Sequence, residues 1–426
     1  MKRRVGCAIL GARMKRILAA SSLVVLGSTA ALAGGYDTQG LGSFSMLFDD
    51  SKFAVEGSYT YVDRNVNVKN AKGQLFAGPA GNLDVPGNGV LGPLSGDSSS
   101  SMTPNVWTYG LSVKAQIVDN VDCMAKLHNP WIIGEKFSTT WAGRYQIDST
   151  DADSLGIDAT CAYKFALGES NNLRVFGGLR TTTIDYLSTT FVNGTVAAGA
   201  GIPVPPGRDY LATIDFSSDD LGVGWRAGAA YEIPEYALRA MISYDSAVDV
   251  GLAGDRIFGT SRTPGTASIT LPESVEIALQ SGVAPGWLVG VDAKWMNWSR
   301  LSSLKVDFAN GDYRIRRLGY SDGWTVRGFV KHKLSEKFGV GASLTWDKGI
   351  GGAYSDTYAI GSGVSYDLNE KATVSLGGSA IYKTASKNNK IVIDSKSRGT
   401  ESTSTTTYDY DGSWNFAVNS KLKLKF

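Results

Sequence analysis

The strongest constraint on the fold is an alternation of apolar and polar residues with a period of two. It is clearest in the last thirteen residues, WNFAVNSKLKLKF, from Trp414 to Phe426. Because successive side chains of a β-strand point to opposite faces, the pattern predicts a strand with one apolar and one polar face. A soluble antiparallel sheet shows such alternation too, but a tilted strand needs about 9–11 residues to cross a bilayer, and this one is long enough.

The two ends of the chain indicate export. An alternating strand that ends on Phe426 resembles the assembly signature of bacterial outer-membrane barrels, which makes the barrel-assembly machinery an expected partner during biogenesis. At the other end, Lys15 and Arg16 precede a short apolar run, and Ala31-Leu32-Ala33 follows it. This order predicts a secretory signal peptide over residues 1–33. Met14 is an alternative start.

Composition agrees with a β-barrel in a membrane. Mean hydropathy is only −0.09, although the chain carries 19 tyrosines, 10 tryptophans and 15 phenylalanines. A barrel conceals its apolar band from hydropathy averages because apolar residues take alternate positions. The net charge of +2 argues against nucleic-acid binding by bulk electrostatics.

The spacing of turns predicts the architecture. Fourteen alternating segments occur between residues 53 and 426, and turns of two to five residues alternate with longer segments near 63–104, 188–218 and 251–265. Short turns on one side, long loops on the other and an even strand number are typical of transmembrane barrels. We therefore predict an all-β fold, a transmembrane antiparallel β-barrel of about 14 strands over residues 53–426.

Nothing in the sequence indicates catalysis, a metal or a cofactor. His128 and His332 are the only histidines, and no Ser-His-acid or paired-carboxylate arrangement is placed together by the alternation. Cys123 and Cys161 follow the predicted leader, and their spacing fits no metal motif. Both fall on the outward face of neighbouring predicted strands, so we predict a disulfide between them.

Several segments resemble the FadL family of outer-membrane transporters. LPESVEIAL (Leu271 to Leu279) and VAPGWLVGVDAKWMNWSRLSSL (Val283 to Leu304) are similar to the most recognisable run of that family, and Gly224 to Ser246 and Val364 to Tyr382 resemble neighbouring strands. The resemblance implies a monomer in the outer membrane of a Gram-negative bacterium. It also implies passive uptake of long-chain fatty acids or other hydrophobic compounds, with outer-membrane lipid as the receiving phase.

The resemblance further implies an amino-terminal plug and a lateral exit. Only residues 34–52 precede the first strand, so the plug is short, and it lacks the family's Asn-Pro-Ala segment. The exit is expected at a kink in the third strand, where Pro130, Trp131 and Gly134 stand, because proline removes a ladder donor. An ordinary β-bulge is the alternative.

A fatty acid requires apolar walls and one or two cations for its carboxylate. Alternation directs several cations and apolar residues into the lumen; for each cation, a structural salt bridge is the alternative. The candidates are Arg174, Arg180, Arg239, Lys294, Arg327, Phe176, Trp298 and Phe329, and Lys126 and Lys331 follow the same pattern. A capture groove, or else a plain packed loop, is expected from Phe191, Val192, Ile202, Val204 and Leu211.

Two other functions fit a barrel of this kind. A general porin is favoured by the short plug and disfavoured by apolar residues in the lumen. A structural or adhesive surface barrel would suit the long Ser- and Gly-rich segment at 63–104.

Overall fold

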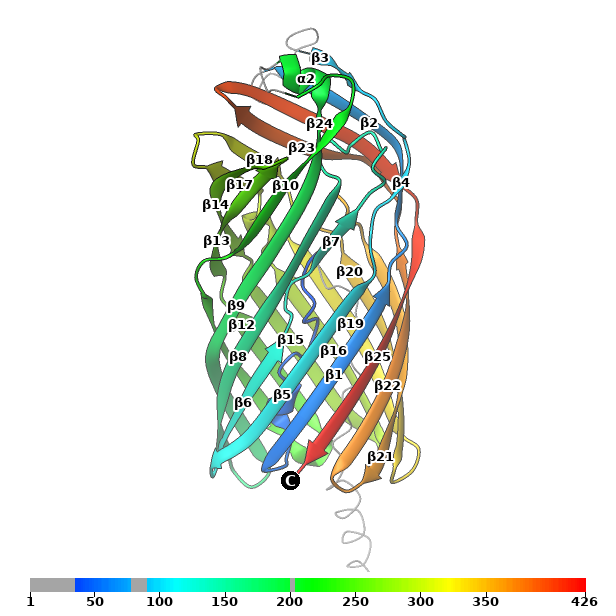
Figure 1. The fold of residues 1–426 in the computed structure, drawn as a ribbon. Coiled ribbons are helices and arrows are strands. Elements are labelled where there is room, and N and C mark those ends of the chain that lie inside the picture. The colour runs from blue at the N-terminus through cyan, green and yellow to red at the C-terminus, as the bar shows by residue number, and fades with distance from the viewer. Residues whose placement is uncertain (1–34, 78–89, 200–203) are drawn as a thin grey trace, which may run out of the picture.

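The computed structural model describes residues 35–77, 90–199 and 204–426, and the predicted signal peptide lies outside these ranges. The chain forms a tall antiparallel barrel, drawn in Figure 1 with its strands tilted to the barrel axis. Strand pairing closes the barrel, because β1 pairs with β25 on one side and with β5 on the other. In order around the barrel the strands are β1 (Phe53–Asp63), β5 (Val106–Val118), β6 (Val121–His128), β8 (Ser149–Leu167), β9 (Asn171–Asn193), β11 (Gly222–Ile233), β12 (Leu238–Asp245), β15 (Ser274–Ala284), β16 (Trp287–Met296), β19 (Gly323–Lys333), β20 (Phe338–Lys348), β21 (Thr357–Asn369), β22 (Ala372–Lys383) and β25 (Ser413–Lys425).

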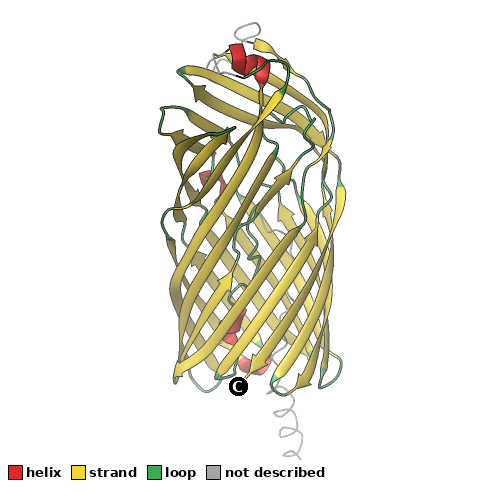
Figure 2. Ribbon diagram, in the orientation of Figure 1, coloured by secondary structure: helices red, strands yellow, loops and turns green. Residues whose placement is uncertain are grey.

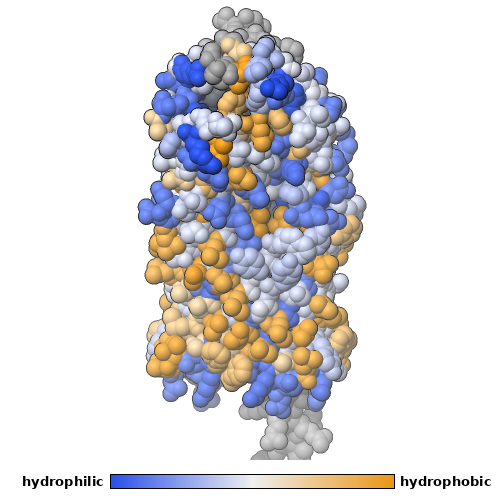
Figure 3. All heavy atoms as spheres, viewed as in Figure 1, coloured by the Kyte–Doolittle hydropathy of each residue, from blue (hydrophilic) through white to orange (hydrophobic). Residues whose placement is uncertain are grey.

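These are the predicted fourteen strands, and the predicted all-β barrel is confirmed. The two faces of each strand differ as the alternation requires. On β8, Leu155 and Ile157 point outward and are 44% and 54% exposed, whereas Ser154 before them and Asp158 after them point into the lumen and are buried. Figure 3 shows the result on one face of the molecule, where apolar side chains gather across the lower half of the barrel.

Within the described residues, large parts of the three segments predicted as long loops form strands, so the prediction of loops is wrong for these parts. They extend the barrel wall beyond its upper end, the end opposite to the C terminus (Figures 1 and 2). The strands outside the barrel are β2 (Asn67–Ala77), β3 (Val90–Leu94), β4 (Ser100–Ser101), β7 (Ile133–Lys136), β10 (Asp209–Ser218), β13 (Val248–Phe258), β14 (Ser261–Leu271), β17 (Ser303–Phe308), β18 (Tyr313–Arg317), β23 (Ser386–Ser397) and β24 (Thr400–Tyr410).

Pairing among these strands builds one continuous extension from β9 through β10, β13, β14, β17, β18, β23 and β24 to β2. Asp312, in the β17–β18 turn, ties three parts of it together. Its carboxylate accepts hydrogen bonds from Arg256 at 2.9 Å, from the Arg398 backbone N–H at 2.8 Å and from Asn310 at 2.9 Å. Burial raises the pKa of Asp312, but these donors outweigh it and the pKa is lowered from its ordinary value. The extension is therefore held by charge as well as by backbone pairing.

The residues before β1 run inside the barrel. We call residues 35–52 the lumen segment; it includes the 3-10 helix η1 (Ser45–Phe48), whose Leu47 is fully buried. The remaining helices are short: α2 (Gly194–Gly199), η3 (Pro234–Tyr236) and η4 (Trp298–Arg300). None of the helices in the described ranges has the length and apolarity needed to cross a membrane.

Candidate functional site

The third strand of the barrel is interrupted at the predicted position. β6 pairs with β8 up to His128 opposite Gly156, and pairing resumes only with β7, at Ile133 opposite Ala152. Residues 129–132 therefore leave the ladder; we call them the strand break. Gly156 permits the close approach, because a Cβ there would lie 2.9 Å from Cγ of Pro130.

Side chains satisfy the backbone groups that the strand break leaves unpaired. The Asn129 amide accepts a hydrogen bond from the Tyr109 N–H at 3.0 Å and donates one to the Trp107 carbonyl at 3.1 Å, both on β5. On the other side, the Ser154 hydroxyl of β8 accepts from the Trp131 N–H and donates to the Trp131 carbonyl, both at 2.8 Å. Because buried backbone groups need partners, these two side chains allow the break to exist without orphaned donors.

The lumen segment is paired with the strand break. The Thr38 N–H donates to the Pro130 carbonyl at 3.0 Å, and the Ile132 N–H donates to the Tyr36 carbonyl at 3.1 Å. Asp37 and Trp131 form an isolated antiparallel bridge between them. The break thus faces the lumen segment rather than a neighbouring strand of the barrel.

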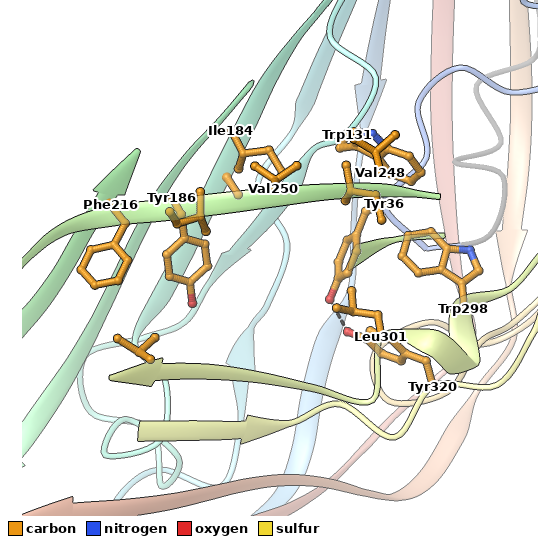
Figure 4. Packing of buried hydrophobic residues seen from close by; sticks show 14 of the residues in the cluster. Tyr36, Trp131, Ile184, Tyr186, Phe216, Val248, Val250, Trp298, Leu301 and Tyr320 are labelled. Atoms are coloured by element: carbon orange, nitrogen blue, oxygen red, sulfur yellow. Dashed lines mark hydrogen bonds between the residues drawn. The ribbon is translucent and has the colours of Figure 1, made fainter. Parts of the chain in front are cut away.

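An aromatic cluster surrounds the amino-terminal end of the lumen segment (Figure 4). The Tyr36 ring lies 5.5 Å from Trp298 and 5.9 Å from Tyr320, edge to face in each case, and its hydroxyl is hydrogen-bonded to that of Tyr320. Trp131 of the strand break packs on Trp298 at 5.8 Å. Of these residues, Trp131 and Trp298 were predicted from the sequence, whereas Tyr36 was not, because it stands in a segment without alternation.

The five predicted cations Arg174, Arg180, Arg239, Lys294 and Arg327 reach the lumen, and each one already forms an ion pair. Lys126 and Lys331 also line the lumen, without a carboxylate oxygen within 4.0 Å among the described residues. Arg174 bridges Asp122 and Glu232, and Arg239 contacts the same Glu232. The remaining pairs are Arg180 with Asp245 at 3.1 Å, Lys294 with Asp37 at 2.6 Å, and Arg327 with Asp292. For these cations the structure shows salt bridges, the alternative to ligand binding. A ligand carboxylate would therefore have to displace a protein carboxylate at each of them.

The other predicted site residues are divided between the lumen and the extension. Phe176 packs against Phe44 and Phe48 of the lumen segment, with ring centroids 5.4 and 6.1 Å apart, and Phe329 lies under Arg327 and Lys331. Leu211 of β10 is the direct cross-strand neighbour of Phe191 on β9, and Val192 is that of Tyr210. Val204 precedes β10, and Ile202 lies outside the described residues.

Two recesses flank the lumen segment near the strand break. The upper one is lined by apolar residues such as Val62 and Ile381, by polar residues such as Thr103, and by Asp347, Arg64 and Lys383. The sequence did not indicate these two cations, because they stand at the upper strand ends. The lower one is bounded by β25, β1, β5 and β6 and is mostly polar, with Ser58, Thr60 and Lys126 among its lining residues. Of these two recesses, the lower one is thus the more polar.

A disulfide joins β6 and β8 near the lower end of β6, close to the turn at residues 119–120. Cys123 of β6 and Cys161 of β8 are direct cross-strand partners and are bonded to each other in the structure. The pair lies on the outer face, so it does not enter either recess.

Comparison with known proteins gives one consistent family. A family model described as outer membrane protein transport protein (OMPP1/FadL/TodX) matches residues 44–423. The chain is 23% identical over 347 residues to the long-chain fatty acid transport protein of Escherichia coli O157:H7, which covers 71% of this chain and 76% of that protein. It is 22% identical over 364 residues to outer membrane protein P1 of Haemophilus influenzae, which covers 78% of this chain and 76% of that protein.

Solved structures show the same fold. A Pseudomonas aeruginosa FadL homologue superposes with a TM-score of 0.68 at 14% identity and covers 95% of this chain and 99% of its own. The toluene transporter TodX of P. putida gives a TM-score of 0.55 at 13% identity, with 90% and 92% covered.

Proposed function

Because the chain belongs to the OMPP1/FadL/TodX family of outer membrane transport proteins, we propose that it takes up long-chain fatty acids or similar compounds by passive diffusion with lateral release. Proteins of this family are non-enzymatic barrels that carry hydrophobic compounds across the outer membrane of Gram-negative bacteria. In such barrels the short turns face the periplasm and the long loops face outward. The upper end of this barrel is accordingly the extracellular end.

The proposed route begins at the extracellular extension. Phe191 and Leu211 are side by side on the β9–β10 hairpin, and Leu211 is 48% exposed, which suits a first contact with an apolar compound. From there the compound passes to the aromatic cluster around Tyr36. The lumen segment, which covers the described part of the plug predicted at residues 34–52, closes the axial path in this proposal.

The strand break is the observation that carries the proposal. The recess next to the break, between β25, β1, β5 and β6, is lined mostly by hydroxyl groups and charges, such as Ser58 and Lys126, whereas the outside of the wall is apolar at Trp107 and Leu155. Moving apolar surface into a polar, hydrated recess costs about 25 cal/mol per Å². An apolar compound at the break therefore gains by leaving sideways into the bilayer, and Pro130, Trp131 and Gly134 are the proposed edge of that exit.

Photo-crosslinking with a diazirine-labelled long-chain fatty acid tests the route. The full barrel in phospholipid vesicles is loaded from the extracellular side, irradiated at short intervals and mapped by peptide mass spectrometry. Lateral release predicts adducts on residues 128–134 and on the outward face of β5 at Trp107. These adducts should appear before any adduct near Phe48 at the periplasmic end of the lumen segment.

The matched control is a photoreactive monosaccharide, because a hydrophilic solute does not partition into the bilayer. Fatty-acid adducts at Phe48 and along the lower recess, with none on residues 128–134, would contradict lateral release. They would indicate an axial route past the lumen segment.

A further inference from the structure

The extracellular extension closes into a second ring above the barrel. Besides the pairing that runs from β9 to β2, β2 pairs with β4, and the Lys136 N–H at the end of β7 donates to the Met102 carbonyl at 2.8 Å. β7 pairs with β8, and β8 pairs with β9, where the extension begins. A compound that enters along the barrel axis therefore has to pass through this ring.

Residues 137–148, which connect β7 to β8, lie inside the ring; we call them the cap segment. Trp141 is fully buried, and Gln146 and Ile147 are 1% and 2% exposed. Trp141 and Ile147 belong to an apolar cluster that includes buried residues of three extension strands. These residues are Val68 of β2, Ile391 and Ile393 of β23, and Tyr408 and Tyr410 of β24. The cap segment therefore occupies the axial entrance to the lumen.

The cap segment is a compact loop with its own internal contacts. Its two ends are joined, because the Phe137 N–H donates to the Asp148 carbonyl at 2.9 Å. The Phe137 and Trp141 rings are stacked with centroids 4.0 Å apart, and the Trp141 indole N–H donates to the Ile147 carbonyl at 2.9 Å. A loop whose ends are adjacent and whose side chains pack on one another can move as a unit without unfolding the strands that it joins.

Polar contacts attach the cap segment to three strands of the ring. The Thr406 hydroxyl of β24 donates to the Gln146 side-chain carbonyl at 2.7 Å, and the Arg314 guanidinium of β18 donates to the Gln146 backbone carbonyl. Arg144 forms an ion pair with Asp209 of β10 at 2.8 Å. The net strength of such contacts is modest, because water replaces them when the segment moves outward.

Resting on the proposed transport function, we infer that the cap segment is the entry gate of the barrel and that its latch is at Gln146. A compound gathered at Phe191 lies next to this gate, since the Phe191 N–H of β9 donates to the Arg144 carbonyl at 2.9 Å. Outward movement of the cap segment opens the path from there to the aromatic cluster around Tyr36. Its return leaves the compound between the cap segment and the lumen segment, with the strand break as the exit.

A reversible disulfide between the cap segment and the ring tests the gate. The Thr140 hydroxyl donates to the Asp97 carboxylate at 2.5 Å, and the neighbouring Ser98 carbonyl accepts from the Ala71 N–H of β2 at 2.9 Å. Asp97→Cys with Thr140→Cys is oxidised on intact cells that lack another fatty-acid transporter, and uptake of radiolabelled hexadecanoate is measured before and after reduction. We expect the oxidised variant to lose uptake and the reduced variant to recover it.

The matched control is Ser395→Cys with Ser402→Cys, a pair on β23 and β24 whose hydroxyls lie 3.1 Å apart in the wall of the ring. This disulfide should leave uptake unchanged in both states. Wild type treated with the same reductant accounts for any effect of opening the native disulfide. Heat-modified gel migration confirms that each variant is folded.

Thiol labelling measures opening of the gate independently of transport. Val66 is 4% exposed and belongs to the same cluster as Trp141, so Val66→Cys reacts with a membrane-impermeant maleimide added outside only when the cap segment moves. Thr406→Val in this background removes the latch hydroxyl and should raise the labelling rate about two- to tenfold, as for the loss of one hydrogen bond. Thr405→Val, the next residue on the opposite face of β24, should leave the rate unchanged.

The outcomes separate the gate from the transport function. Full hexadecanoate uptake by the oxidised cap disulfide would overturn the gate, because entry would then bypass the cap segment, and the transport function would stand. If wild type takes up no hexadecanoate, the transport function fails. The gate is then upheld if Thr406→Val speeds labelling of Val66→Cys, and it is overturned if Thr406→Val and Thr405→Val give the same rate.

Discussion

Asn129 is a single residue on which the strand break depends. It is 2% exposed, and its side-chain amide takes the place of two backbone groups by bonding both Trp107 and Tyr109 of β5. A residue without that amide would leave a donor and an acceptor of β5 unpaired in a buried position. Residues 129–132 could instead move outward and pair with β5 again, but this would break their hydrogen bonds to the lumen segment.

We therefore expect Asn129→Ala to lower the free energy of unfolding by about 1–3 kcal/mol, the cost of leaving a buried polar group without a partner. Urea titration of the barrel in lipid vesicles, followed by tryptophan fluorescence, measures the change. Asn67→Ala, at an exposed position in β2, is the control and should stay within about 0.5 kcal/mol of wild type. Equal stability of the two variants would show that water replaces the amide without loss.

Residue-level roles were only partly predictable from the sequence. Alternation placed Arg174, Lys294 and Arg327 in the lumen, because the inner and outer faces of a barrel strand differ so strongly. It did not reveal their counter-ions, since the partner of Lys294 is Asp37, 257 positions away in the chain. Arg64 escaped prediction for a related reason: it follows the end of β1, where the alternation stops.

At the scale of elements, the disulfide between β6 and β8 fixes the barrel wall near the lower end of β6, on the strand that is interrupted by the break. We expect alkylation without prior reduction to label neither Cys123 nor Cys161. Replacing both by serine should lower the free energy of unfolding by about 2–4 kcal/mol, as for bridges that close loops of this kind. The control is Ala125→Ser with Ala159→Ser, a cross-strand pair on the same two strands. Two alkylated cysteines in the untreated wild type would contradict the assignment.

The lower end of the lumen segment is held by Asp49, which forms an ion pair with Lys423 of β25 and accepts a hydrogen bond from the Ser51 N–H at 2.9 Å. Burial alone would raise the pKa of Asp49, but Lys423 and Ser51 outweigh it and lower the pKa from 3.8 to about 2. Because the folded pKa lies below the ordinary value, the attachment is complete above pH 3.8 and is lost as the pH falls toward about 2.

Ion conductance of the barrel should therefore stay constant from neutral pH down to about 5 and rise only as Asp49 becomes protonated. Asp49→Asn should produce the same rise at neutral pH. Asp50→Asn is the control, because Asp50 is the next residue and is exposed. A conductance in Asp49→Asn no different from that in Asp50→Asn would show that the lumen segment is held from above, at Asp37 and Trp131.

A strand could be predicted from the sequence where its two faces differ in polarity. The barrel strands have lipid on one side and the lumen on the other, so their alternation gave the strand number. Among the extension strands, TESTSTTTYDY of β24 is mostly polar and so lacks the contrast that marks a strand. Others, such as β10 and β13, bury apolar residues such as Phe216 and Leu252, but glycines, prolines and polar residues around them favour loops at 188–218 and 251–265.

At the scale of the whole molecule, a closed wall of fourteen strands is combined with a lumen that the chain fills from within. Lys294 and Asp37, Lys423 and Asp49, and the backbone of the strand break tie the lumen segment to three parts of the wall. A wide barrel with an empty lumen conducts ions freely, whereas one crossed by buried ion pairs does not. The barrel should therefore be closed to ions although its plug is short.

Single-channel recording of the refolded barrel in a planar bilayer, with and without a long-chain fatty acid, examines this property directly. We expect no steady conductance in either condition, because a substrate that leaves through the wall does not need the axial path to open. Tyr36→Ala should introduce brief openings, since it removes the aromatic contacts of the lumen segment with Trp298 and Tyr320. A steady conductance in the wild type that the fatty acid does not block would instead identify a porin, and lateral release would then lose the sealed lumen on which it depends.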